Sequence, residues 1–344
     1  MKLNDVVTKV YAFFKQSKAK SAAKAIDATT ETASTQTQVS ASTQASSAAT
    51  SSQPAKKHKS KLRRTLEPIV LALAAILCFT YPVASTLWNN NLSKEISAAY
   101  DRMSKELPKD ARIVNLEKAR EYNAQRSAIF TADPYNGSDD YKNTPEYKKY
   151  ESVLDEPMGI MGIVKIPKIG VKLPIYHGSS TEVLAQGAGH LYGTDLPVGG
   201  KTRHSVVTAH TGLPHATMFD DLIYLKKGDY FYFDIQGETL RYRVFRINVV
   251  EPNDISMLQR EKGRDLATLL TCTPYGVNTQ RLLVTGYRVL PDPVSAPGDK
   301  LQWPLWMTMF VLALIGCAVI LATMIIAAVR RHRKNIAPHG RHLN

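Results

Sequence analysis

Two long uncharged stretches dominate the pattern of apolar and polar residues along the chain. Residues 68–88 and 305–329 are runs of 21 and 25 residues without Asp, Glu, Lys or Arg. About 20 predominantly apolar residues are enough for a helix to cross the hydrocarbon core of a bilayer. The pattern therefore predicts transmembrane helices at 65–88 and 305–329, on either side of a larger central region.

The central region begins with a helical pattern. Apolar residues recur at three- and four-residue spacing from Leu92 on, and again after Pro108. We therefore predict a helical region at 89–130. Residues 131–150 are rich in Asp, Asn, Gly, Pro and Tyr, a turn-forming composition that predicts a long loop and linker over 131–154.

Short strand-like runs separated by turn residues make up the rest of the central region. Only brief helical pieces such as 182–186 interrupt them. Strands in this number predict one mainly β domain, a barrel or a sandwich, at 155–292, followed by a linker at 293–304. The predicted strands are 160–166, 171–176, 205–209, 230–235, 240–250, 268–272 and 282–290.

Positive charge is concentrated outside the central region. The chain has a formal net charge of +14, yet residues 89–302 hold 27 Lys and Arg against 26 Asp and Glu. The surplus lies largely just before the first uncharged stretch and just after the second. The positive-inside rule then predicts a two-pass cell-membrane protein with cytoplasmic termini and an extracellular central region. The excess of basic residues thus indicates membrane topology and not nucleic-acid binding.

The predicted cytoplasmic tails are 1–64 and 330–344. Residues 28–55 are almost entirely Ser, Thr, Ala and Gln, so the first tail is predicted to be largely disordered, with a basic end. A cleaved signal peptide, with a processing site near Ala84, is the competing interpretation of the first stretch. We favour an uncleaved anchor because the apolar run is long for a signal and many residues precede it.

One thiol in the central region is a candidate nucleophile. Cys78 and Cys317 lie in the predicted spans, which leaves Cys272 without a disulfide partner in its own domain. Arg281 follows nine residues later, and if the strand-like runs around both residues pair, the sulfur and the guanidinium come close together. Arginine favours a thiolate and can stabilise an oxyanion during acyl transfer. The alternative is a small core cysteine and a solvated arginine, but an unpaired extracellular thiol is exposed to oxidation, which favours a chemical role.

A cysteine nucleophile usually needs a histidine as general acid and base. Of the five histidines between the spans, His210 stands out because it ends the predicted strand at 205–209 and precedes Thr211-Gly212. A strand exit is a common position for catalytic side chains. The other four are interpreted as surface or satisfied core residues: His177, His190, His204 and His215.

The motifs around these residues resemble those of the sortases, membrane-anchored cysteine transpeptidases of Gram-positive bacteria. Thr268-Leu269-Leu270-Thr271-Cys272 matches the family's Thr-Leu-x-Thr-Cys signature, with Arg281 nine residues later and Thr208-Ala209-His210 upstream. Asp133-Pro134-Tyr135 resembles the lid motif of class C, pilin-polymerising sortases, which typically have two flanking transmembrane segments. The resemblance covers residues 155–292 and implies an eight-stranded sortase-type barrel with N-terminal helices and a lid loop.

The resemblance also implies a role for each residue. Cys272 would attack the Thr-Gly carbonyl of a Leu-Pro-x-Thr-Gly-like sorting signal and hold the cleaved protein as a thioester. His210 would protonate the departing amine and deprotonate the incoming one, and Arg281 would position the substrate and stabilise the oxyanion. Thr271 and Thr208 would contact the substrate.

The lid motif and the partners follow from the same resemblance. Asp133 would lie against Arg281 and Tyr135 over Cys272, so that the lid, with Pro134 between them, blocks the site until it moves away. The implied partners are the lipid bilayer and pilin subunits that carry an LPxTG-like sorting signal and an acceptor lysine. Their joining would give an isopeptide-linked pilus. No cofactor or metal is implied.

Three other interpretations remain open at this point. A housekeeping sortase that attaches surface proteins to peptidoglycan shares the chemistry but typically lacks the lid and the second span. A cell-wall cysteine peptidase generally places its cysteine before its histidine, whereas His210 precedes Cys272 by 62 residues. A non-enzymatic adhesion module would leave the thiol beside Arg281 without a purpose.

Overall fold

The computed structural model describes residues 61–126, 133, 135, 140–155, 157–298 and 303–336. The chain divides into two compact units, Met1–Leu66 and Glu67–Asn344, and the elements below belong to the second, apart from the start of one helix. Most of the predicted N-terminal tail, the last eight residues and Pro134 of the predicted lid motif lie outside the described residues.

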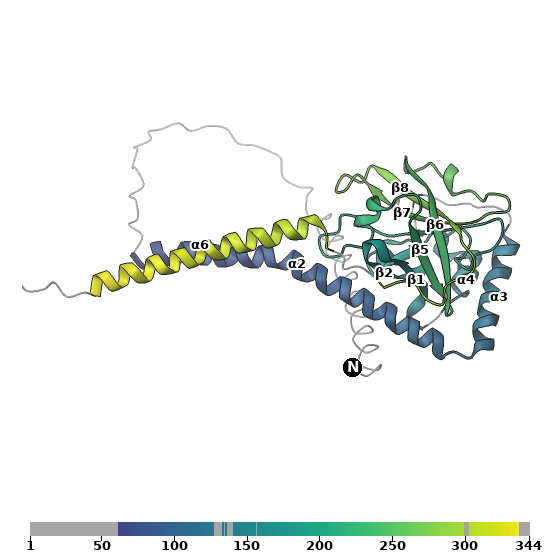
Figure 1. Cartoon of the computed structure of the whole chain (residues 1–344), viewed down its shortest axis with the longest axis horizontal. Coiled ribbons are helices and arrows are strands. Elements are labelled where there is room, and N and C mark those ends of the chain that lie inside the picture. The colour runs from purple at the N-terminus through teal and green to yellow at the C-terminus, as the bar shows by residue number, and fades with distance from the viewer. Residues whose placement is uncertain are drawn as a thin grey trace, which may run out of the picture. The chain divides into compact units, whose positions relative to one another are not determined.

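Eight strands close into a barrel in the order β1-β2-β3-β4-β7-β8-β6-β5 (Figure 1). This confirms the predicted eight-stranded barrel. The β2–β3 and β4–β7 neighbours are parallel, and the other neighbouring pairs are antiparallel. The strands are β1 (Ile160–Ile166), β2 (Val171–His177), β3 (Ala188–His190), β4 (Arg203–Thr208), β5 (Tyr230–Ile235), β6 (Glu238–Val250), β7 (Asp265–Thr273) and β8 (Gln280–Arg288).

Strand β3 is the one that the sequence pattern missed. It has three residues, which is too short a run to show a period of two. Its central glycine is required by a close backbone approach, since a Cβ on Gly189 would lie 2.3 Å from the carbonyl oxygen of Gly178. The other seven strands were predicted with ends that differ by a few residues, because backbone pairing continues into polar residues such as Glu238 and Asp265.

The strand directions define two ends of the barrel. Strands β4 and β7 run in the same direction, so both finish at one end, where the loops 209–229 and 274–279 follow. We call this the Cys272 end. The opposite end holds the β5–β6 turn and the starts of β4 and β7.

One cluster of buried apolar side chains draws on all eight strands and fills the barrel. Phe231 and Phe233 of β5 lie with their ring centroids 5.5 Å from that of Tyr242 on β6. Burying one large apolar side chain contributes about 1.5–3 kcal/mol to folding. Such a core gives the loops at both ends a rigid base.

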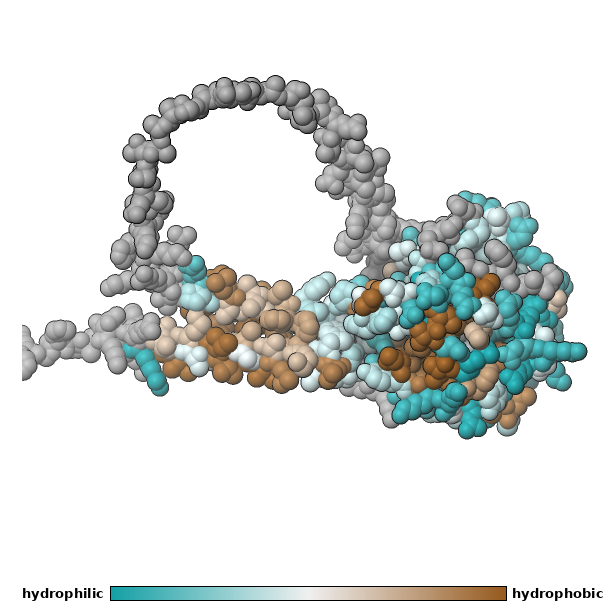
Figure 2. All heavy atoms as spheres, turned by 90° about the horizontal axis from the view of Figure 1, so that it is seen from above, coloured by the Kyte–Doolittle hydropathy of each residue, from teal (hydrophilic) through white to brown (hydrophobic). Residues whose placement is uncertain are grey.

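A single helix, α2 (Lys61–Glu106), joins the first uncharged stretch to the helical pattern that follows it. The sequence had suggested a span and a separate helix. α3 (Lys109–Gln125) follows Pro108 as predicted, and α6 (Leu305–Ile336) contains the second uncharged stretch (Figure 1). By length and composition α2 and α6 are each able to cross a membrane, and apolar side chains cover their outer surfaces (Figure 2).

Part of the segment predicted as a loop over 131–154 is helical. It holds η1 (Asp140–Asn143) and α4 (Pro145–Glu151), and Thr144 Oγ1 caps α4 by accepting a 3.2 Å hydrogen bond from the Tyr147 backbone N–H. Residues that favour turns also favour helix starts, so composition alone predicted a loop here. The remaining short helices are α5 (Thr181–Leu184), η2 (Pro157–Gly159), η3 (Pro167–Ile169), η4 (Asp220–Tyr224) and η5 (Ser256–Leu258).

Candidate active site

Cys272 and Arg281 are direct neighbours across two strands. In the antiparallel pairing of β7 with β8, Cys272 lies opposite Arg281. Side chains that are directly opposite on one face have Cβ atoms about 4.5–5.5 Å apart. The thiol is buried, with 8% of the residue exposed, and the two strands hold it beside the guanidinium as the sequence predicted.

His210 reaches the same place from β4. The parallel register pairs Thr208 with Leu270, so two residues further on His210 comes level with Cys272. Two hydrogen bonds extend this register beyond the strand: Ala209 N donates to Leu270 O at 3.3 Å, and Thr271 Oγ1 donates to Ala209 O at 2.7 Å. The His210 carbonyl then accepts from Phe219 N at 3.0 Å, which closes the following loop.

Asp133 forms a buried ion pair with Arg281. The carboxylate accepts from Arg281 Nε and Nη2, each at 2.7 Å, and the two side chains are 3% and 8% exposed. Bidentate pairs of this kind fix both distance and orientation. Two carbonyl oxygens, those of Asn278 and Gln280, accept from Arg281 Nη1 at 3.0 Å, so the arginine is held from both sides.

Tyr135 lies over the three candidate catalytic residues. Its ring centroid is 5.4 Å from the His210 ring and 4.9 Å from Arg281 Cζ. Its hydroxyl donates to Ala209 O at 2.8 Å and lies 2.9 Å from Thr208 Oγ1. The ring also packs on an outer apolar cluster made of Leu191, Val206, Leu258, Leu270 and Leu283. Both described residues of the predicted lid motif are thus in contact with the site.

The closed arrangement favours the neutral form of the Cys272 thiol. Burial raises the pKa of Cys272 and outweighs the lowering by Arg281, while the Asp133 carboxylate adds to the rise. Arginine therefore acts as the sequence predicts, but its effect is partly cancelled by its own acidic partner. The hydrogen bond to Asp133 raises the pKa of Arg281, so the guanidinium stays charged.

The histidine is also shifted toward its neutral form. Burial lowers the pKa of His210, and the neighbouring charge of His215 lowers it further. A neutral imidazole can accept a proton, as a general base must.

Thr208 and Thr271 lie at the site, but their hydroxyls already have protein partners. Thr208 is fully buried beneath the Tyr135 hydroxyl, and Thr271 ties β7 to the carbonyl of Ala209. The predicted contact of these two residues with substrate stays a prediction. In this arrangement they connect the strand of the cysteine, the strand of the histidine and the lid motif.

Asp220 is a site residue that the sequence analysis missed. Its Oδ1 accepts from Thr211 Oγ1 at 3.0 Å and from Gly212 N at 2.8 Å, which orders the two residues that follow His210. Among the described residues, its Oδ2 is buried without a hydrogen-bond partner. Burial raises the pKa of Asp220 from 3.8 to about 7. An Asp-Asp pair ten residues after a histidine carries no recognisable signal in the sequence.

Replacing Asp220 with asparagine is expected to stabilise the protein at alkaline pH. The raised pKa means that burial of the carboxylate opposes folding, and this cost grows as pH rises from 3.8 and is complete above about 7. Asparagine keeps the Oδ1 acceptor without the charge. The free energy of unfolding should rise by about 1–3 kcal/mol at pH 8 and by less at pH 5. Denaturant unfolding at both pH values measures this, and a loss of stability at pH 8 would contradict it.

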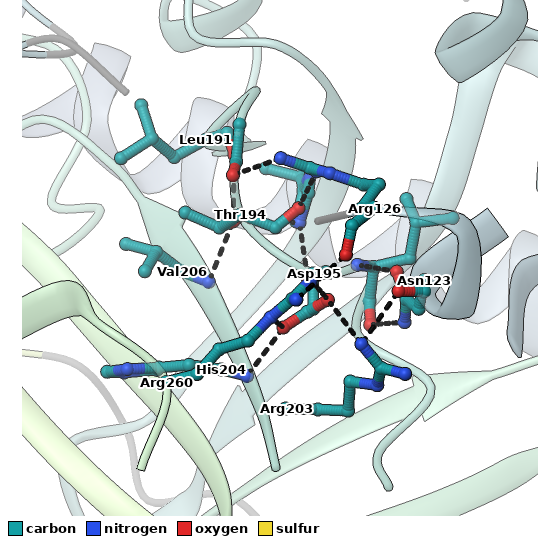
Figure 3. Close-up of polar contacts among 12 residues, drawn as sticks. Asn123, Arg126, Leu191, Thr194, Asp195, Arg203, His204, Val206 and Arg260 are labelled. Carbon is teal, nitrogen blue, oxygen red and sulfur yellow. Dashed lines mark hydrogen bonds and ion pairs between the residues drawn. The ribbon is translucent and has the colours of Figure 1, made fainter. Parts of the chain in front are cut away.

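The start of the segment that leads to the lid motif is tied to the barrel by a buried acid (Figure 3). Asp195 is fully buried, and its two oxygens accept from Arg260 Nη2 at 2.5 Å and Nε at 2.8 Å. Arg260 Nη1 also donates to the carbonyl of Arg126 at 2.9 Å, and Arg126 donates to the carbonyls of Gly193 and Thr194. On the far side of the motif, Tyr150 of α4 bonds to His190 of β3. The lid motif therefore lies between two fixed points, the Arg126–Arg260–Asp195 contacts before it and the Tyr150–His190 bond after it.

A cleft of about 900 Å³ lies at the opposite end of the barrel. Arg203, Asp265 and Arg288, at the starts of β4 and β7 and the end of β8, contribute to its lining. It is a full strand length away from Cys272. The candidate catalytic residues lie under Tyr135, and none of them lines this cleft.

Comparison with known proteins decides the family. A family model described as "Sortase domain" matches residues 164–289. The crystal structure of sortase C-1 from Actinomyces oris is 48% identical, with a TM-score of 0.50, over 52% of this chain and 99% of that chain. The chain belongs to the sortase family. Members of this family are cysteine transpeptidases, and the structural relatives of this sortase include class C sortases.

Two further relatives show the range of the similarity. A sortase C of Streptococcus pneumoniae, whose crystal structure is described as informative on catalysis and pilin substrate specificity, is 36% identical. That match covers 59% of this chain and 99% of the other, with a TM-score of 0.52. Sortase A of Staphylococcus aureus is 30% identical over 123 residues, which cover 35% of this sortase and 58% of that protein.

Proposed function

We propose that this sortase is a membrane-anchored, pilin-polymerising transpeptidase that cleaves an LPxTG-like sorting signal and transfers the acyl group to a lysine. The observation that carries the proposal is the convergence of Cys272, His210 and Arg281 beneath Asp133 and Tyr135. The first three residues supply nucleophile, acid/base and oxyanion stabiliser. The last two make the lid that distinguishes a class C sortase from the housekeeping alternative.

The proposed reaction has two acyl-transfer steps. The Cys272 thiol passes its proton to His210 as the sulfur attacks the threonine carbonyl, the C–N bond to glycine breaks, and His210 gives that proton to the departing amine. A lysine amine then attacks the thioester and loses a proton to His210, an isopeptide C–N bond forms, and the C–S bond breaks. Arg281 stabilises the negative oxygen of both tetrahedral intermediates, once Asp133 has released it.

The outer apolar cluster supports an apolar sorting signal. Leu191, Leu258 and Leu283 belong to this cluster, which lies where the Tyr135 ring packs. When the Tyr135 ring moves away, the apolar cluster beneath it becomes available to the leucine and proline side chains of the sorting signal. Burial of one leucine side chain there would contribute about 1.5–3 kcal/mol to binding. In this proposal the lid motif and the substrate compete for one surface.

Membrane anchoring is the second part of the proposal. The two long apolar helices flank the barrel in sequence, and basic residues lie in the last turns of α6 and before the apolar part of α2. The positive-inside rule supports cytoplasmic termini and an extracellular barrel. Pilin subunits would then meet the enzyme outside the cell.

Altering the lid motif should expose and activate the thiol. Burial is the largest cause of the raised Cys272 pKa, and Asp133 adds to it, so Asp133→Ala/Tyr135→Ala should lower that pKa. One pKa unit corresponds to about a tenfold larger thiolate fraction at neutral pH. Iodoacetamide alkylation of Cys272, followed against pH by intact-mass spectrometry, measures both effects.

The matched control for the lid variant is Asp155→Ala, which removes an exposed carboxylate on the C-terminal side of the lid segment. This control should alkylate at the wild-type rate. Equal alkylation of the lid variant and the wild type would contradict an autoinhibitory lid.

The choice of acceptor amine tests the pilin assignment. The full-length enzyme with the lid substitutions would be given an LPxTG peptide and either a lysine-containing pilin fragment or an oligoglycine peptide. We expect the isopeptide product with the lysine acceptor. Preferential transfer to oligoglycine would favour the alternative, an enzyme that anchors surface proteins to peptidoglycan.

A further inference from the structure

The loops at the Cys272 end are tied to α2 immediately after its uncharged stretch. Asn89 Nδ2 donates to the carbonyl of His215 at 2.8 Å. Asn90 Nδ2 donates to Thr217 Oγ1 at 2.6 Å, and its Oδ1 accepts from Thr217 N at 3.1 Å. The stretch ends at Trp88, one residue earlier. These bonds therefore hold the loop that follows His210 within about 3 Å, along the helix axis, of the end of the stretch.

This distance is small compared with the thickness of the interfacial layer of a bilayer. The polar layer on each side of the hydrocarbon core is roughly 5–8 Å thick. If residues 68–88 cross the core, as the proposed function requires, residues 215–217 lie at headgroup depth. A rigid helix with three side-chain hydrogen bonds leaves the loop little freedom to rise away from the surface.

The same end of the barrel carries large apolar side chains that are exposed to solvent and not buried in the core. Ile223 and Tyr224 of η4 are 63% and 62% exposed, and Tyr275 and Val277 of the β7–β8 loop are 56% and 65% exposed. We call these four residues the interfacial patch. The loop 209–229 and the β7–β8 loop are neighbours, because a Cβ on Gly212 would lie 3.6 Å from the Gly276 nitrogen. Gly212 N also donates to Asp220 of η4, which places η4 beside this contact.

The charges around the patch suit a lipid surface. Lys226 and Lys227 follow η4 and are exposed. The acids of the same loop are Asp220, Asp221 and Asp229. Burial raises the pKa of the Asp220 and Asp221 carboxyl groups, which reduces their negative charge near neutral pH. Asp229 accepts from the Lys226 backbone N–H at 2.6 Å and forms an ion pair with Lys168, which offsets its charge. Tyrosine is enriched at the membrane–water interface, and lysines attract anionic headgroups.

We propose that the interfacial patch and its two lysines rest on the outer surface of the lipid bilayer, so that the site of Cys272 opens at headgroup depth. This inference rests on the membrane anchoring in the proposed function and deepens it. The enzyme would then act on segments that emerge from the same bilayer, before they extend into solution. A protein partner on the patch is the alternative occupant, and the experiment separates the two.

Site-specific photocrosslinking in the full-length chain tests the inference. p-Benzoylphenylalanine would replace Tyr224, Tyr275, Tyr287 or Leu77, one at a time, in protein reconstituted into vesicles of phosphatidylglycerol and phosphatidylcholine. Tyr287 is the matched control, because it is 37% exposed and lies at the opposite end of the barrel. Leu77 lies inside the uncharged stretch and is 72% exposed, so it reports whether α2 is in the membrane at all.

We expect lipid adducts at Leu77, Tyr224 and Tyr275, each several-fold above the level at Tyr287, measured by mass spectrometry. Adducts at Leu77 alone would overturn the interfacial patch and leave the anchor intact. Adducts with protein in place of lipid at Tyr224 and Tyr275, when the chain is isolated from its own cells, would overturn it in favour of a protein partner. No adduct at Leu77 would overturn the anchoring and with it this inference.

Discussion

Replacing Cys272 with alanine is expected to reduce transpeptidation by roughly 10⁴-fold or more, because no other group can form the thioester. The barrel should stay folded, since alanine leaves only a small gap at a position that is 8% exposed. The measurement is the rate of LPxTG peptide cleavage in the presence of an amine acceptor, with circular dichroism to show that the fold is kept.

The control for this prediction comes from the chain itself. Cys78 and Cys317 are also free thiols, one in each long helix. Alanine at either position should leave the rate unchanged. Activity that survives Cys272→Ala, or that disappears with Cys317→Ala, would mean that the nucleophile has been misassigned.

Replacing His210 with alanine is the second large effect. A positioned general acid and base typically contributes about 10²–10⁴-fold, and here the same imidazole is proposed to serve both acyl-transfer steps. We expect a loss in that range for transpeptidation. When His210→Ala is combined with the lid substitutions, the Cys272 thiol should still react with iodoacetamide. Alkylation has no departing amine that a general acid must protonate.

His215→Ala is the matched control for the histidine. The His215 contact with Asn89 uses the backbone carbonyl, which alanine keeps. Loss of its charge should raise the pKa of His210, since His215 contributes to the present lowering. The acidic limb of the pH–rate profile should therefore move to higher pH, with most of the maximal rate retained. Wild-type activity in His210→Ala would remove the acid/base assignment.

The sequence predicted the parts of the site that depend on short-range spacing. Cys272 and Arg281 are nine residues apart across a β7–β8 hairpin, so the pairing of two strands was enough to bring them together. His210 could be singled out because it leaves a strand, but only the parallel β4–β7 register explains why it meets Cys272. Parallel neighbours are far apart in sequence and leave no local pattern.

Other parts of the site could not be derived from spacing. Asp133 and Arg281 are 148 residues apart, and only the resemblance of a three-residue motif suggested their contact. Asp220 acquires its importance from burial and from the loop it closes, neither of which the sequence displays. The direction of the Cys272 pKa shift also depends on burial under Tyr135, which outweighs the nearby guanidinium.

In the fold, too, elements with a long local pattern were predicted and elements that depend on tertiary contacts were not. Long periodic elements such as α3 and the strand β6 were predicted, since their patterns extend over many residues. Strand β3 and helix α4 were not, because each is short and depends on tertiary contacts such as the bond between Tyr150 and His190. The continuity of α2 through Asn89 to Asn91 was missed as well, since three asparagines favour a break in isolation.

The most direct test of the central claim is a search for an acyl adduct on Cys272 by intact-mass spectrometry. The full-length enzyme, wild type and Asp133→Ala/Tyr135→Ala, would be incubated with an LPxTG peptide without an amine acceptor. The account predicts a thioester adduct on Cys272 that is stronger in the lid variant than in the wild type. No adduct in either form, with the iodoacetamide control showing an accessible thiol, would contradict the proposed sorting-signal chemistry.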